Sequence, residues 1–135
     1  MLSLLDIDPA AAAPIWRQIE EGMRRLVASG ALPVGAAVPS VRELARELRV
    51  NPATVSKAYQ KLTADGALEV RRGEGTFVAA RSARAVSAER ERLLARGAEG
   101  FVEAARSMGV SKSEARAAVS AAWDRVDKEG DEEKR

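Results

Sequence analysis

Residues 39–62, PSVRELARELRVNPATVSKAYQKL, contain two helix-start signals in close succession. Ser40 and Glu43 form a capping box, in which the serine hydroxyl accepts a hydrogen bond from the backbone N–H three residues later. Asn51 is a preferred N-cap, and Pro52 suits the first helical position because its missing N–H would have no partner there. Two short helices separated by a few residues are typical of a helix-turn-helix.

The flanking residues extend this pattern on both sides. After Pro14, apolar residues recur at helical spacing from residue 15 to residue 26, and Ser29-Gly30 ends the predicted helix. The segment 31–39 contains Pro33, Gly35 and Pro39, so we expect a loop there. Residues 68–70 and 76–78 alternate as strands do around the glycine-containing loop 71–75, which predicts a β-hairpin. A helix, a helix-turn-helix and a hairpin in this order describe a winged helix.

The C-terminal part is predicted to consist of two amphipathic helices. We expect a winged helix-turn-helix domain at 1–80, a hinge at 81–84, a helical dimerisation region at 85–128 and a charged, disordered tail at 129–135. Gly97 and Gly100 could bend the first helix, and a capping box from Ser111 to Glu114 opens the second. Apolar residues that we expect to mediate dimerisation are Leu93, Leu94, Phe101, Met108, Val119 and Trp123. The predicted fold is therefore mainly α-helical with a small β-hairpin.

Composition excludes several classes of protein. The chain has 135 residues, enough for one ordinary domain and a modest appendage, and it contains neither His nor Cys. Without His there is no usual general base and no common zinc site, so we expect no enzyme, no cofactor and no metal. No membrane span and no signal peptide are apparent, which predicts a cytoplasmic protein. The 22 Lys and Arg are nearly balanced by 20 Asp and Glu, so net charge alone does not indicate nucleic acid.

Four blocks follow one another in the N-terminal part: PIWRQI at 14–19, VPSVRELA at 38–45, VNPATVSKAY at 50–59 and RGEGTFV at 72–78. In this order they closely resemble the GntR family of bacterial repressors over about residues 10–80. The Asn-Pro start of the recognition helix, with only 57 residues (79–135) after the last block, is similar to the YtrA-like subfamily. Other subfamilies carry much larger C-terminal domains.

The resemblance implies roles for individual residues. Arg42 would contact a guanine or a backbone phosphate, and Arg72 and Gly73 in the wing would approach the minor groove. Residues implied in the turn and on the leading face of the recognition helix are Asn51, Ala53, Thr54, Ser56 and Lys57. Physical principles agree, because the N-terminal end of a recognition helix reaches base edges and Arg is the best bidentate partner of guanine. Glu74 departs from the family pattern by placing an acid at the wing tip.

These observations predict a regulator that binds a pseudo-palindromic operator in double-stranded DNA as a homodimer, and most simply a repressor. An alternative from another class stays open: a winged helix used as a protein-interaction module without its own operator, which the modest net charge favours. We expect no small-molecule effector, because 57 residues after the wing are too few to enclose a pocket of roughly 300 Å³ or more.

Overall fold

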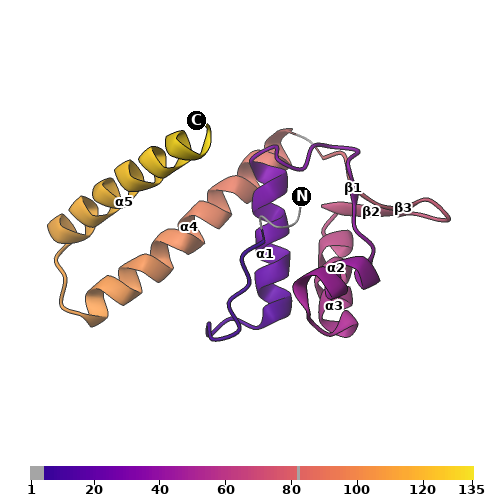
Figure 1. The fold of residues 1–135 in the computed structure, drawn as a ribbon, viewed down its shortest axis with the longest axis horizontal. Helices are drawn as coiled ribbons and strands as arrows, with labels where there is room; N and C mark the ends of the chain where they lie inside the picture. The colour runs from indigo at the N-terminus through magenta and orange to yellow at the C-terminus, as the bar shows by residue number, and fades with distance from the viewer. Residues whose placement is uncertain (1–4, 82) are drawn as a thin grey trace. The chain divides into compact units, whose positions relative to one another are not determined.

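The computed structural model describes residues 5–81 and 83–135, which form two compact units, one up to Leu93 and one from Leu94 to Arg135. The elements along the chain are α1 (Ile15–Ala28), β1 (Ala37–Val38), α2 (Val41–Leu48), α3 (Pro52–Ala64), β2 (Leu68–Arg71), β3 (Gly75–Val78), α4 (Ala83–Ser107) and α5 (Lys112–Glu133) (Figure 1). The predicted fold class, a winged helix-turn-helix followed by two helices, is confirmed. Expectations for residues 1–4 and for position 82 in the hinge lie outside the described residues.

Helix α1 begins directly after Pro14, whose carbonyl accepts the first backbone hydrogen bonds of the helix. The preceding arm is tied to the helix by Gln18, whose side chain accepts from the N–H of Asp8 and donates to its carbonyl. Leu5 then packs so closely on Gly22 that a Cβ at that position would lie 2.4 Å from a Leu5 methyl. The arm is therefore part of the packed N-terminal unit.

The helix-turn-helix has the predicted caps. The Ser40 hydroxyl accepts from the N–H of Glu43 at 3.1 Å, and helix α2 ends at Arg49 in a left-handed conformation with φ 57°. The phenol of Tyr59 in α3 donates to the carbonyl of Pro39 at 2.7 Å, which holds the start of α2 against α3. Burial, with the nearby charges of Glu43 and Glu47, raises the pKa of Tyr59 above its ordinary value of 10.0.

The wing is a three-stranded antiparallel sheet with strand order β1-β3-β2. Strand β2 pairs with β3 as predicted, with Leu68 opposite Val78 and Arg71 opposite Gly75. The expectation of a simple loop at 31–39 is wrong in part, because Ala37 and Val38 pair with β3 as strand β1. A two-residue strand has too few positions to show an alternating pattern, and the neighbouring Pro and Gly conceal it further.

One hydrophobic core holds this unit together. Helices α1 and α2 both pack on α3, which also contacts β2. The residues buried in the core are Leu5, Ile19, Met23, Leu32, Val38, Leu44, Ala45, Val55, Ala58, Tyr59, Leu62, Ala67, Leu68 and Val78. Burying one Leu, Ile, Val or Met side chain stabilises a fold by about 1.5–3 kcal/mol. Such a core explains how a domain with few aromatic residues holds its recognition helix in place.

Two expectations for the C-terminal region, the hinge and the disordered tail, need correction. Helix α4 begins at Ala83, so half of the expected hinge 81–84 is helical, and the first unit continues to Leu93. The helix runs without interruption past Gly97 and Gly100, because two glycines cost only about 1 kcal/mol each against more than twenty helical residues. The tail expected to be disordered at 129–135 is helical as far as Glu133, which the high helix propensity of Lys and Glu supports.

The turn between α4 and α5 is as predicted. Gly109 takes a positive φ of 71°, and Ser111 caps α5 by accepting from the N–H of Glu114 at 3.2 Å. Among the residues that the structure describes, no helix is both long and apolar enough to cross a membrane.

Candidate nucleic-acid interface

The N-terminal end of helix α3 presents the residues implied in DNA recognition. The side-chain oxygen of Asn51 accepts from the N–H of Ala53 at 2.8 Å, so Asn51 caps the helix whatever else it contacts. Asn51 and Ala53 are exposed, whereas Thr54 and Ser56 are half-buried. The first turn of a helix also has backbone N–H groups without intrahelical partners, which can bind a phosphate.

Arg42 lies near the start of α2, the helix that buries Leu44 and Ala45. Its side chain is exposed and forms no ion pair within the described part of the chain. The simplest non-functional explanation, a surface arginine paired with Glu43 or Glu47 on its own helix, therefore finds no support. An exposed guanidinium beside a recognition helix is available for a guanine or a phosphate.

Trp16 of α1 orders two cations of the recognition helix. The ammonium of Lys57 lies 4.4 Å from the centre of the Trp16 ring, and that of Lys61 lies 5.0 Å from it. Cation–π contacts of this kind contribute about 0.5–1 kcal/mol at exposed sites. Sequence reasoning identified Lys57 but missed Lys61 and its shared aromatic partner, because the contact joins helices that are far apart in the sequence.

The two neighbouring arginines of the wing, Arg71 and Arg72, differ in their contacts. The guanidinium of Arg71 donates twice to Glu69, at 3.0 and 2.8 Å, and lies 4.2 Å from the centre of the Phe77 ring. Arg72 is exposed and has no ion-pair partner among residues 5–81 and 83–135. Gly73 follows at the tip with φ 78°, a conformation that favours glycine. Arg72 is thus the arginine of the pair that is free to contact DNA.

Comparison with known proteins identifies the family. Residues 16–78 match the model of "Bacterial regulatory proteins, gntR family". The chain is 38% identical to the uncharacterized HTH-type transcriptional regulator YhcF of Bacillus subtilis over 77% of its own length and 85% of that protein. It belongs to the gntR family.

A second relative indicates which group within the family this chain resembles. The HTH-type transcriptional repressor YtrA of Bacillus subtilis is 44% identical over 75 residues, which is 56% of this chain and 58% of YtrA. The chain is therefore YtrA-like, although the match spans little more than half the length of YtrA. The gntR-family relatives named here are regulators by name rather than enzymes.

Solved structures agree with this placement. A GntR family transcriptional regulator from Listeria monocytogenes matches with a TM-score of 0.68 and 27% identity over 85% of this chain and 98% of that one. The DNA-binding domain of AraR in complex with operator ORX1 matches with a TM-score of 0.50 and 28% identity over 56% of this chain and 93% of that one. This gntR-family chain is a DNA-binding transcriptional regulator.

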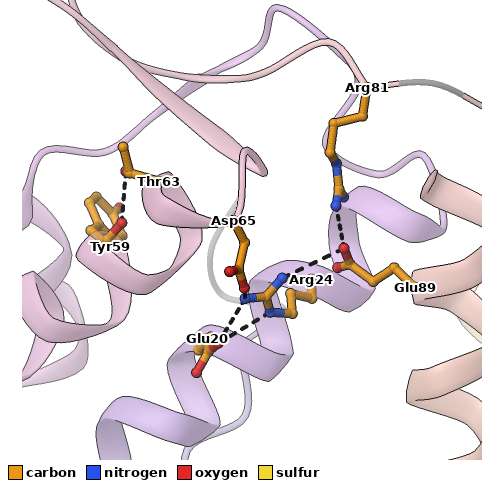
Figure 2. A network of polar contacts seen from close by, with 7 residues as sticks. All are labelled: Glu20, Arg24, Tyr59, Thr63, Asp65, Arg81 and Glu89. Atoms are coloured by element: carbon orange, nitrogen blue, oxygen red, sulfur yellow. Dashed lines mark hydrogen bonds and ion pairs between the residues drawn. The ribbon is translucent and has the colours of Figure 1, made fainter.

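A buried polar network centred on Arg24 joins α1 to the end of α3 and to the start of α4 (Figure 2). Arg24 of α1 donates to Glu20 at 2.8 Å and to Asp65 at 2.5 Å, and its guanidinium forms an ion pair with Glu89 of α4 at 3.6 Å. Arg81 donates to the same Glu89 carboxylate. Burial alone would lower the pKa of Arg24, but the hydrogen bonds to Glu20 and Asp65 and the charge of Glu89 raise it above its ordinary value.

Sequence reasoning missed this network entirely. Arg24 and Glu89 are among the least exposed residues of the chain, although charged residues are almost never fully buried unless they are paired. Glu20 and Arg24 are four residues apart, which hinted at one ion pair on α1. Nothing in the sequence connected that pair with residues 65, 81 and 89.

The helices of the C-terminal unit expose the apolar residues that were expected to mediate dimerisation. The exposed fraction is 75% for Leu94, 72% for Met108 and 69% for Trp123, and 41% for Phe101 and 47% for Val119. Leu93 differs, because it is half-buried at the end of the N-terminal unit. No residue of α5 is buried.

No group of three or more acidic residues is placed to hold a metal ion within the described parts of the chain.

Proposed function

We propose that this regulator is a repressor that binds a pseudo-palindromic operator as a homodimer in the cytoplasm. Its mechanism is steric, because a dimer that covers promoter DNA blocks the polymerase. The observation that carries the proposal is the combination of a packed DNA-binding unit with a C-terminal unit whose large apolar side chains are bare.

The bare side chains support dimerisation through residues 94–126. Leu94 and Phe101 of α4 and Met108 in the turn after it recur every seven residues, the repeat of a helix-packing seam. Val119 and Trp123 recur four residues apart on α5. A second copy of the chain is the commonest partner for such a surface, and a two-fold axis would bury each residue on both copies. Leu93, next to this seam, contributes where α4 leaves the N-terminal unit.

The polar interface supports a division of labour in DNA binding. Arg42 and the leading face of α3, with Asn51, Ala53, Thr54, Ser56 and Lys57, read bases and nearby phosphates. Arg72 and Gly73 in the wing make backbone or minor-groove contacts that do not depend strongly on sequence. No small-molecule effector is part of this proposal.

The test is selection of bound fragments from genomic DNA by the full-length protein, followed by titration of the selected duplex and a random duplex. We expect preference for a selected sequence with two-fold symmetry, and sedimentation of two chains per duplex. If each chain makes about three phosphate contacts, log K against log salt should fall with a slope of about −5. Equal affinity for random DNA, or a flat salt response, would instead support a protein-interaction module without an operator.

A further inference from the structure

Arg24 of α1 contacts residues from two other parts of the fold, the end of α3 and the start of α4 (Figure 2). Asp65, one of its partners, is the C-cap of the recognition helix α3. Glu89, another partner, lies in the first turns of α4, and Arg81 reaches Glu89 from the segment after β3. One guanidinium therefore joins the end of the recognition helix to the start of the helix that continues into the C-terminal unit.

This junction is a costly way to attach a helix. The side chains of Arg24 and Glu89 are only 5% and 4% exposed, so both charges have lost most of their hydration. Apolar residues of similar volume would often hold two elements together at least as strongly as a buried ion pair. What charged partners add is directionality, because they are satisfied in few arrangements.

The rest of the contact between α4 and the winged helix is thin. The inward stripe of α4 in the N-terminal unit consists of Val86, Glu89 and Leu93, and only Glu89 of these is buried. The pair is also incompletely satisfied, since Arg24 Nη1 and Glu89 Oε1 have no hydrogen-bond partner among the residues that the structure describes. The first turns of α4 are thus held mainly by charge, at one position.

We propose that Arg24 and Glu89 determine which spacing between operator half-sites the protein accepts. This inference rests on the proposed function, in which a dimer places two recognition helices on one operator. Each added base pair moves the second half-site by about 3.4 Å and turns it by about 35° around the DNA axis. A recognition helix tied through Arg24 to α4 does not follow such a displacement, whereas a loosely attached one does.

The experiment uses palindromic duplexes built from the half-site that the wild-type protein selects, with the selected spacing and with one or two base pairs added or removed. Affinities are measured for the full-length wild type, for Glu89→Gln and for Glu91→Gln. Glu91 is exposed on the same helix, so its substitution removes the same charge without touching the network. A duplex with a single half-site reports the integrity of the DNA-reading surface.

We expect the wild type and Glu91→Gln to lose at least about tenfold in affinity when the spacing changes, because the two half-sites can no longer be engaged together. For Glu89→Gln the loss should shrink below about threefold, with unchanged affinity for the single half-site. If Glu89→Gln does not fold, the double variant Arg24→Met with Glu89→Leu removes both charges and should show the same relaxed spacing.

Two results would overturn the proposal, and they are distinguishable. If Glu89→Gln binds the single half-site normally and keeps the wild-type spacing penalty, the network does not set the spacing. If the wild type binds one and two half-sites with equal affinity and shows no preference for any spacing, the proposal that the protein binds its operator as a dimer is wrong. The role of Arg24 and Glu89 in spacing is then wrong as well.

Discussion

The two units of the chain differ in how they place their apolar side chains. The N-terminal unit buries fourteen apolar side chains in one core, whereas Ala105 is the one apolar residue of the C-terminal unit buried among those that the structure describes. Seven of the nine large apolar side chains found exposed in residues 5–81 and 83–135 belong to the C-terminal unit. The difference separates a unit with its own hydrophobic core from a pair of helices whose large apolar side chains are exposed.

The largest expected effect comes from removing the C-terminal unit. A chain ending at Leu93 keeps the core and the Arg24 network, so we expect it to stay folded and to sediment as a monomer. Its affinity for an operator with two half-sites should fall at least about a hundredfold, because the second half-site loses its tether. Sedimentation and operator titration of both chains measure this. A dimer of the shortened chain would place the interface in the winged helix.

Single substitutions in the seam should weaken the dimer by less. Trp123→Ala or Phe101→Asp should raise its dissociation constant about thirtyfold, as expected for a large anchor residue that contributes about 2 kcal/mol. Val34→Asp is the matched control, since Val34 is 63% exposed in the N-terminal unit. Sedimentation over a concentration series, with thermal unfolding of the winged helix followed in parallel, separates lost assembly from lost folding. Equal weakening by the control would refute the assignment.

Within the N-terminal unit, substitutions of Arg42 and Arg72 should differ in their effect on base preference more than in the affinity they lose. Arg42→Ala should cost about 1–3 kcal/mol and relax the base preference at one position of the operator. Arg72→Ala should weaken all sequences evenly, as a backbone contact does. Both variants, with Arg46→Ala as an exposed control on α2, are titrated against single-base operator mutants. Identical losses of the Arg42 variant on every operator would show that it does not read a base.

The smallest effect concerns Tyr59, the single tyrosine of the chain. Its pKa is raised in the folded state, so the unfolded chain releases the phenolic proton near pH 10 while the folded chain retains it. Stability is therefore complete below that pH and falls as the pH rises above it, by about 1.4 kcal/mol per pH unit.

Urea unfolding between pH 8 and 11 measures this loss, and Tyr59→Phe should remove it. The chain ending at Leu93 should show the same slope, because the phenol belongs to the packed unit. A phenolate absorbance that appears near pH 10 in the folded protein would contradict the prediction.

The sequence predicted well what depends on local chemistry. Helix caps and turn glycines are recognised from a few neighbouring residues. The caps at Ser40, Asn51 and Ser111 form in the structure, and the wing glycines take positive φ angles. The family resemblance supplied the DNA-binding candidates, whose surface positions agree with those roles for Arg42 and Arg72 but do not test them.

What sequence reasoning missed depends on contacts across the fold. Strand β1 exists because β3 lies beside it, and Lys61 gains a partner because Trp16 lies on a neighbouring helix. The burial of Glu89 is the clearest example, since a glutamate in an arginine-rich helix is indistinguishable in sequence from a solvated one. Such charges are recognised only when the segments that surround them are known.

The uninterrupted course of α4 has a consequence for insertions and deletions. A helix carries rotational phase along its length, so adding one residue after Leu93 turns everything beyond it by about 100° and moves it by about 1.5 Å. Adding seven residues nearly restores the phase and moves the seam by about 10 Å, since seven residues make close to two turns. Length changes in this connection should therefore be tolerated in sevens, where a flexible linker would accept any number.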